Sequence, residues 1–333
     1  MPRHHPNGAS RDSDPPTEDG AEVPSRRLGR APDEALERAL GWAAEQGFAA
    51  TSTEPLAGDV SARRYVRLTA GAERLVLALY PPEIASTCER FTATSHILTQ
   101  AGVRVPRLVA VDCEHGRMLL EDVGRATLFD ERDRGWMELE PYLELAVEVV
   151  ARLAALPATS VAGLNPPLDE TLLARELEHT WRIALGDADL VRGGFPAALA
   201  TAFGRMVSEL ARSPRVVAHR DFMARNLVPL PADSGSPRRI VVLDHQDLRL
   251  APAAYDLASL LNDSLYPPTD LADRLRSRLA DSVRTIDYHR AAAQRGLKIV
   301  GTFLGFAERG DRRHLPLVDP SLEAARGHLA VLP

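Results

Sequence analysis

The chain has 333 residues, with 40 basic and 46 acidic side chains and a formal net charge of −6. A hydrophobic fraction of 45% and a charged fraction of 26% are ordinary for a globular protein with a sizeable core. The slight acidic excess gives no reason to expect a general nucleic-acid binder, and no apolar run reaches the roughly 18 residues that cross a bilayer. The polar N-terminus lacks the apolar segment of a signal peptide, so we expect a cytoplasmic protein.

The first third of the chain predicts a tail and a small lobe. Residues 1–30 are rich in Pro, Asp, Arg and Ser and poor in apolar residues, so we expect a disordered tail. Residues 31–123 then read as a helix, a hairpin formed by "RRYVRLTAG" and "ERLVLALY", a second helix over 84–100, and a second hairpin that turns at 114–116. This order predicts a small mixed sheet with one long helix inserted.

Residues 124–333 are mostly helical in pattern. The segment "MELEPYLELAVEVVARLAAL" has an apolar stripe at helical spacing, and a further helix is expected over 168–184. Two short strands, around 215–218 and 239–243, are joined by a short connection, so we expect them to pair as a hairpin. The fold class is therefore α+β, with a larger, mainly helical second lobe.

Two residue types are scarce enough to matter. The cysteines, Cys88 and Cys113, have no partner at metal-ligand spacing, and we interpret both as reduced packing residues. Nearly all basic residues are arginine, and Lys298 is the only lysine of the chain.

The stretch "VVAHRDFMARNLV" carries the main chemical signal. Asp221 follows an apolar strand, Asn226 comes five residues later, and Asp244 follows the second strand in "RRIVVLDHQD". One carboxylate and one amide oxygen suit Mg²⁺, and a further carboxylate can accept a proton from a hydroxyl, as phosphoryl transfer requires. We therefore interpret Asp221 as the base and Asn226 and Asp244 as metal ligands, with His219 supporting the loop by a backbone hydrogen bond. The alternative is that these are loop carboxylates that cap helices.

The residues of this motif occur within a wider resemblance. From about residue 35 to 315, the chain resembles the aminoglycoside phosphotransferase superfamily. Within that superfamily it is most similar to bacterial cell-wall amino-sugar kinases, which phosphorylate N-acetylmuramate and N-acetylglucosamine at the anomeric hydroxyl. The segments that carry the resemblance include "GDVSARRYVRL", "LLEDVG", "HRDFMARN", "LDHQD", "YDLASLLND" and "QRGLKIVGTF". The resemblance implies a protein-kinase-like, two-lobed fold, with a small N-terminal β-sheet lobe over 31–123 and a catalytic, substrate-binding lobe over 124–333.

The resemblance also implies an ATP site between the lobes. The backbone of residues 118–123 would be the hinge that meets the adenine, and the loop 58–64 would cover the phosphates. The implied nucleotide contacts are Gly58, Ser61, Arg63, Arg64, Glu121 and Val123. Without the family, the loop also reads as a plain polar turn. The lysine that such folds place on the third strand is missing from "LVLALY", and Arg63 or Arg64 is the hypothesised replacement.

Several residues near Asp244 have two possible roles. Gln246 and Asp247 either hydrogen-bond sugar hydroxyls or, for Asp247, brace the loop. His245 either touches the site or packs, and we favour packing. Asp256 precedes "LASLL" and is expected to be an N-cap.

The expected function is an ATP- and Mg²⁺-dependent kinase that acts on a small sugar in cell-wall salvage. It needs no nucleic-acid, membrane or obligate protein partner. Arg225 and Arg249 suit the lactate carboxylate of N-acetylmuramate. Two alternatives stay open: an aminoglycoside or other small-molecule phosphotransferase of the choline or homoserine type, and an inactive nucleotide-binding regulatory module.

Overall fold

The structure is a computed structural model that describes residues 33–56, 62–184, 197–233 and 235–333. Its helices are α1 (Glu34–Glu45), α2 (Ala85–Gln100), α3 (Trp136–Ala154), α4 (Glu170–Ala184), α6 (Ala197–Ala211), α7 (Tyr255–Asn262), α8 (Thr269–Ser277), α9 (Thr285–Glu308) and α10 (Val318–Leu329). Its strands are β1 (Ser52–Leu56), β2 (Arg64–Ala70), β3 (Glu73–Leu79), β4 (Leu108–Asp112), β5 (Arg117–Glu121), β6 (Arg215–Ala218), β7 (Leu227–Leu230), β8 (Arg239–Val242) and β9 (Arg249–Pro252).

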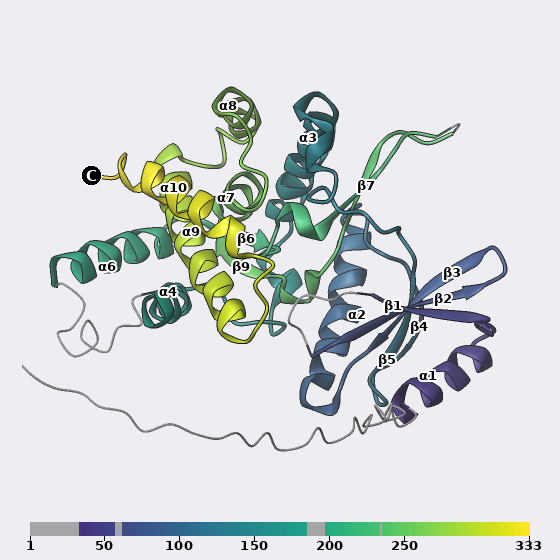
Figure 1. Cartoon of the computed structure of the whole chain (residues 1–333). Helices are drawn as coiled ribbons and strands as arrows, with labels where there is room; N and C mark the ends of the chain where they lie inside the picture. Colours follow the sequence, from purple (N-terminus) through teal and green to yellow (C-terminus); the bar gives the residue numbers. More distant parts are fainter. Residues whose placement is uncertain (1–32, 57–61, 185–196, 234) are drawn as a thin grey trace, which may run out of the picture.

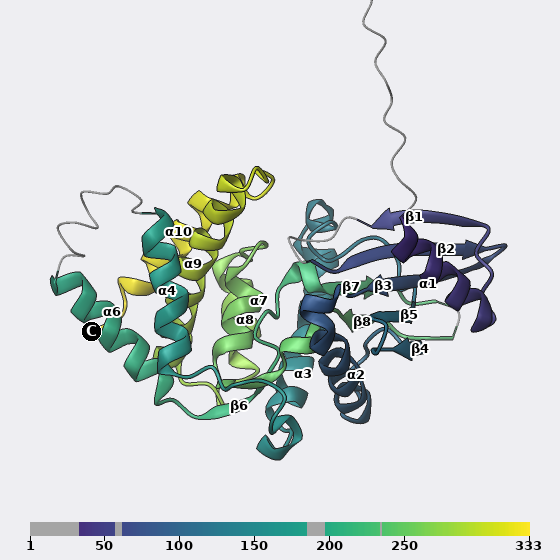
Figure 2. The ribbon, with the colours of Figure 1, turned by 90° about the horizontal axis from the view of Figure 1, so that it is seen from below.

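The molecule has two parts, which the two ribbon views show at opposite ends (Figures 1 and 2). Strands β1 to β5 and helix α1 form one end, and helices α4, α6, α9 and α10 form the other. Helices α2 and α3 and the short strands β6 and β9 lie between them, and β7 and β8 lie on the side of the sheet. The predicted α+β division into a small sheet lobe and a larger helical lobe is therefore present.

The N-terminal sheet is antiparallel, with the strand order β1-β2-β3-β5-β4. Because side chains alternate along a strand, β3 and β5 supply apolar residues to both faces. Leu77 and Leu119 pack with Trp42 of α1 on one face. Tyr80, Met118 and Phe91 of α2 form a separate cluster, so two small cores hold the lobe together.

The two cysteines form a disulfide, so the prediction that both are reduced packing residues is wrong. Cys88 lies on α2 and Cys113 follows β4, with their Cα atoms 5.5 Å apart and the sulfurs bonded at 1.97 Å. The two residues are 25 positions apart in the chain. Their spacing gave no indication of the pair, because the packing of α2 beside β4 brings them together.

The predicted hairpin between the strands at 215–218 and 239–243 is also wrong. Strand β6 pairs with β9, and β8 pairs with β7, which directly follows the motif. The strands β7 and β9 were missed because each contains a proline, Pro229 or Pro252, and proline usually argues against a strand. Both pairs are nevertheless antiparallel, and they flank the loop that carries Asp221.

Helix α9 is the central helix of the larger lobe, because it contacts α4, α6, α7 and α10. It approaches α4 closely at Gly301, where an added Cβ would lie 2.4 Å from the hydroxyl oxygen of Thr180. Only glycine fits there without moving the α4 backbone. Within the described ranges, no helix combines the length and the apolar character needed to span a membrane.

Candidate active site

The loop after β6 is held by a buried carboxylate. Asp256, in the first turn of α7, accepts hydrogen bonds from the backbone N–H groups of His219 at 2.6 Å and Arg220 at 2.9 Å. Its expected role as an N-cap is therefore wrong, since α7 begins after Ala254 and Asp256 bonds the loop instead. The ring of His219 contacts the Leu243 carbonyl at 2.8 Å, which is the expected support. Arg220 takes φ = +77°, a conformation that needs such anchoring.

The predicted base and metal ligands lie together. The Asn226 side chain donates to the backbone carbonyl of Asp221 at 2.8 Å, and the Asn226 carbonyl accepts from the N–H of Leu243 at 2.8 Å. Asp244 comes next and takes a left-handed conformation with φ = +56°. The segments that carry the three residues are thus neighbours, and the β7–β8 pair brings them together rather than the predicted hairpin.

The donor set around Asp244 fits a magnesium ion. The Asn226 amide uses its N–H₂ group on Asp221, and no hydrogen bond to its Oδ1 is present within the described part of the chain. The Asp244 side chain is 37% exposed and is bonded through Oδ1. No group of three or more His, Cys, Asp or Glu residues in the described ranges can hold a metal. An ion here would therefore complete its shell with water and phosphate oxygens, as Mg²⁺ does.

Three cations surround the Asp221 carboxylate. Arg295 donates to Oδ1 at 2.6 Å, Lys298 donates to Oδ1 at 3.2 Å, and Arg220 lies 3.9 Å from Oδ2. Burial would raise the pKa of Asp221, but Lys298, Arg295 and Arg220 hold it well below its ordinary value. Asp221 is therefore a carboxylate at neutral pH.

A second acidic residue balances these cations from α4. Glu176 accepts from Arg220 at 2.7 Å and lies 3.8 Å from the Lys298 ammonium. Although burial opposes the shift, Lys298 and Arg220 lower the pKa of Glu176 to about 2. The other terminal nitrogen of Arg295 bonds Asp263 at 3.0 Å, so a buried network of charges fixes the base.

Arg63 links the two lobes at Asp244. Its guanidinium donates to Oδ1 of Asp244 at 2.6 Å and to Oε1 of Gln246 at 3.0 Å. Its neighbour Arg64 forms an ion pair with Asp33, the N-cap of α1. Of the two predicted arginines, Arg63 is the one that contacts Asp244, the predicted metal ligand. Gly58 and Ser61, predicted to cover the phosphates, lie outside the described residues.

The predicted hinge, residues 118–123, comprises most of β5 and the two residues that follow it. The Glu121 backbone N–H bonds the Arg107 carbonyl at 2.9 Å, and its carboxylate accepts from Arg104 and from the Arg107 N–H. The Asp122 side chain is 4% exposed and accepts two hydrogen bonds from Arg67 of β2, at 2.6 and 3.0 Å. This ion pair anchors the segment that leads through Val123 into the larger lobe.

The residues after Asp244 are mostly engaged with protein. His245 is fully buried against α2, with Thr94 at 2.8 Å and the Phe91 ring at 4.3 Å. Burial, with the charges of His219 and Arg63, lowers the pKa of His245 to about 3, which agrees with the packing role. Asp247 pairs with Arg220 and lies 3.3 Å from Arg249, so it braces the loop here. Gln246 donates to Asp244 at 2.9 Å.

The two arginines expected near the substrate differ in exposure. Arg249 is buried and donates to the Pro166 carbonyl at 3.2 Å. Arg225 is 13% exposed, stacks 5.1 Å from the Phe303 ring centroid and lies 3.1 Å from a ring nitrogen of His314. Arg225 is therefore the better placed of the two for a ligand.

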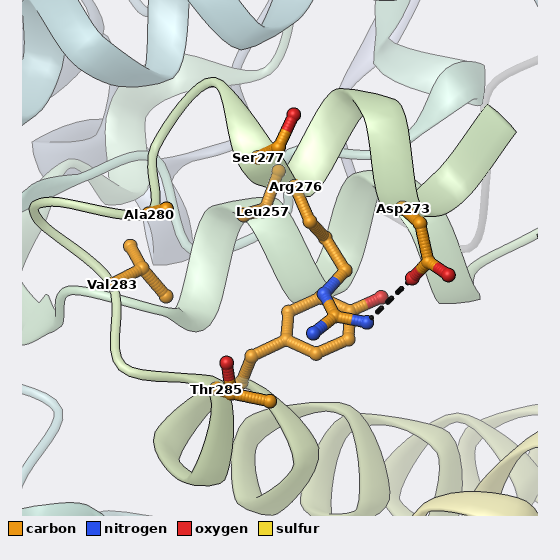
Figure 3. Close-up of a pocket in the computed structure, with 8 residues that line it drawn as sticks. Leu257, Asp273, Arg276, Ser277, Ala280, Val283 and Thr285 are labelled. Carbon is orange, nitrogen blue, oxygen red and sulfur yellow. Dashed lines mark hydrogen bonds and ion pairs between the residues drawn. The ribbon is translucent and has the colours of Figure 1, made fainter. Parts of the chain in front are cut away.

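A pocket of about 220 Å³ lies between α7, α8 and α9, away from these residues (Figure 3). Arg276 points into it, pairs with Asp273 at 2.9 Å and stacks over the Tyr288 ring at 4.5 Å. The lining residues include none of the predicted site residues.

Sequence reasoning missed the residues that surround Asp221. Arg295, Lys298, Glu176 and Asp263 come from α9, α4 and the segment after α7. One signal was available: Arg295 and Lys298 stand three residues apart in the mostly apolar stretch "AAAQRGLKIVG", so both charges lie on one face of a buried helix.

Comparisons with known proteins agree with this geometry. The sequence profile described as the phosphotransferase enzyme family matches residues 52–293. The chain is 31% identical over 270 residues to the N-acetylmuramate/N-acetylglucosamine kinase of Pseudomonas aeruginosa, which covers 79% of this chain and 74% of that protein. It is 28% identical over 283 residues to the protein of the same name from Pseudomonas putida, with 80% of each chain covered.

Solved structures show the same fold. The choline kinase LicA from Streptococcus pneumoniae has a TM-score of 0.66 at 13% identity, over 89% of this chain and 99% of that chain. Wild-type aminoglycoside 2'-phosphotransferase-IIIa has a TM-score of 0.61 at 14% identity, over 90% of this chain and 99% of that chain. The predicted fold and family are confirmed, and the chain belongs to the phosphotransferase enzyme family.

Proposed function

We propose that this protein is an ATP- and Mg²⁺-dependent kinase that phosphorylates the anomeric hydroxyl of N-acetylmuramate, N-acetylglucosamine or both, in the salvage of cell-wall sugars. The observation that carries the proposal is that Asp221, Asn226 and Asp244 lie on two loops that are joined by hydrogen bonds, from the Asn226 side chain to the Asp221 carbonyl and from the Leu243 N–H to the Asn226 carbonyl. The relatives that carry an amino-sugar kinase name support the acceptor.

Asp221 orients the attacking hydroxyl. Because its pKa lies well below the ordinary value, it accepts a hydrogen bond from the hydroxyl at neutral pH but is a weak base. Phosphoryl transfer through a loose transition state needs little early deprotonation, so the proton moves to Asp221 late, as the new O–P bond forms. Its cationic neighbours hold the carboxylate in place for that step.

The nucleotide would lie between the lobes. The backbone at Glu121 and Val123 would meet the adenine, and Arg63, with Gly58 and Ser61, would face the phosphates. Asn226 and Asp244 would hold Mg²⁺, which when bound neutralises phosphate charge. Arg63 bonds Asp244 in the structure, so it stands beside the place where the phosphates and the ion would meet.

The acceptor side favours an anion over a polycation. Arg220, Arg295 and Lys298 lie at Asp221. Arg225 pairs with Asp263 and is the candidate partner of a lactate carboxylate. Gln246 and Asp247 remain candidates for sugar hydroxyls. A polycationic aminoglycoside wants a pocket dominated by carboxylates, whereas here Asp221, Glu176 and Asp263 are already paired with arginine or lysine.

The test measures ADP release with Mg²⁺-ATP and a panel of N-acetylmuramate, N-acetylglucosamine, glucosamine, kanamycin and choline. Phosphorus NMR identifies an anomeric phosphate, and the Asp221→Asn variant is the blank. We expect turnover on the N-acetylated sugars that the variant loses. Turnover on kanamycin or choline alone contradicts the proposed acceptor, and near-wild-type turnover by Asp221→Asn contradicts the proposed mechanism.

We also propose that the enzyme acts in the cytoplasm, where ATP is available. Disulfides are rare in that compartment, so the Cys88–Cys113 bond makes this point testable. Cells lysed directly into an alkylating reagent should yield protein with both thiols blocked if the cytoplasm keeps the pair reduced. Recovery of the disulfide under those conditions counts against a reducing compartment.

A further inference from the structure

Lys298, the only lysine of the chain, has its side-chain ammonium beside Asp221, the proposed base. Lys298 projects from the buried helix α9, and its ammonium lies 3.2 Å from Oδ1 of Asp221 and 3.8 Å from Oε1 of Glu176. Burial and the neighbouring Arg295 lower the pKa of Lys298, and these two carboxylates oppose that shift by favouring the charged form of the amine. Arg295 already bonds the same oxygen of Asp221 at 2.6 Å, so holding that carboxylate in place does not by itself account for a second cation.

The two cations of α9 are placed differently. Arg295 is 2% exposed, and its terminal nitrogens bond the Arg220 carbonyl, Asp221 and Asp263. It therefore acts through Asp221 and has no path to a substrate. The Lys298 side chain is 15% exposed, and within the described residues its ammonium makes one hydrogen bond, to Asp221. An ammonium has three N–H donors, so Lys298 keeps donors for a ligand.

The fold holds Lys298 in this place through a close helix contact. Gly301 follows Lys298 by about one turn of α9, and an added Cβ there would meet Thr180 of α4 at 2.4 Å. Thr180 in turn follows Glu176 by about one turn of α4. The contact that requires glycine therefore also brings Glu176 to Lys298, which limits how far the ammonium can move.

We propose that Lys298 is a catalytic residue whose ammonium donates a hydrogen bond to the transferring phosphoryl group. This inference rests on the proposed function. A hydroxyl that reacts must lie within about 3 Å of the Asp221 carboxylate, and the Lys298 ammonium lies 3.2 Å from Oδ1 of the same carboxylate. The cation therefore stands beside the place where the acceptor oxygen meets the phosphoryl group. The N-terminal lobe has no lysine to place near the phosphates, and Lys298 supplies a positive charge from the larger lobe.

The step balances without a proton from Lys298. The bond between the acceptor oxygen and the γ-phosphorus forms, and the bond between the γ-phosphorus and the β,γ-bridging oxygen breaks. The hydroxyl proton moves to Asp221 and ADP leaves. Lys298 stays protonated and stabilises negative charge on the phosphoryl oxygens, as fixed donors do at such sites.

The kinetic test compares Lys298→Met with Arg290→Met. Arg290 is a 12% exposed cation of the same helix that pairs with Asp287 and Glu209, so its loss is the matched control. We expect Lys298→Met to lower kcat about 10²- to 10³-fold, the usual effect of removing one such donor, with KM for ATP and sugar little changed. Arg290→Met should keep the wild-type kcat. Retention of kcat by Lys298→Met overturns the inference.

A second measurement needs no turnover. Because the chain has one lysine, ¹³C-lysine labelling gives a single side-chain signal. We expect this signal to shift when aluminium fluoride, a mimic of the transferring phosphoryl group, joins a complex of protein, Mg²⁺, ADP and acceptor. An unmoved signal, even with a loss of kcat in the variant, means that Lys298 only positions Asp221 and overturns the contact.

The order of the measurements separates this inference from the function on which it rests. Wild-type turnover is scored first, and its absence on every acceptor counts against the proposed function. If Lys298→Met does not fold, as judged by circular dichroism, the NMR measurement on the wild-type protein still decides the inference.

Discussion

Replacing the carboxylate that anchors the catalytic loop should cost both stability and turnover. Asp256 is 2% exposed and is the acceptor for the N–H groups of His219 and Arg220. In Asp256→Ala both donors stay buried without a partner, at about 1–3 kcal/mol each. Burial raises the pKa of Asp256, which means that the charged carboxylate is itself destabilised by desolvation. Asp256→Ala removes that cost as well, so we take a total from the lower part of the range for the two donors. The expected loss is about 3 kcal/mol in the free energy of unfolding.

Turnover should fall as well, because Arg220 at φ = +77° precedes Asp221 and relaxes when its anchor is lost. Urea unfolding followed by circular dichroism gives the stability, and ADP release gives kcat. The control is Asp270→Asn, an exposed carboxylate paired with Arg274, which should leave the unfolding midpoint unchanged. An Asp256→Ala protein with the wild-type midpoint and kcat would refute this account of the loop.

Three further predictions concern the lobes and their charges. Replacing Cys113 by serine should lower the free energy of unfolding by about 3–4 kcal/mol, because its bond to Cys88 closes a loop of 25 residues. In urea unfolding, a reductant should destabilise the wild-type protein and leave the Cys113→Ser variant unchanged. Arg63→Ala should raise the KM for ATP about 10- to 100-fold in steady-state kinetics, because a charged hydrogen bond is lost. Arg64→Ala should leave this KM nearly unchanged. Equal effects of the two substitutions would contradict the proposal that Arg63 faces the phosphates. The pKa of Glu176 falls from 4.5 to about 2 on folding, so its stabilising effect is full above 4.5 and is lost as the pH drops toward 2. Glu176→Gln should weaken the pH dependence of urea unfolding in that window, and an unchanged slope would count against the network.

The local motifs could be predicted from the sequence because each depends on a few neighbouring residues. Asp221 follows an apolar strand and Asn226 comes five residues later. Both side chains are therefore expected on the loop at the end of that strand. Asp244 could be added because it also follows a strand. The order of helices and strands in the two lobes follows from the same local patterns, which is why the fold class was predictable.

The strand pairing and the disulfide, which join distant segments, could not be predicted from the sequence. Strand β6 pairs with β9, and β7 with β8, because of packing in the larger lobe, and the prolines in β7 and β9 hid two of these strands. The Cys88–Cys113 bond depends in the same way on how α2 lies beside β4.

The sequence by itself determined the family and the candidates for base and metal ligands. Only the tertiary structure decided which charges surround the base. Lys298 is 77 residues from Asp221 in the chain, and Glu176 reaches both through the close contact of α4 with α9 at Gly301. Charges interact according to distance in space and burial, so the electrostatic environment of Asp221 arises only when these helices pack.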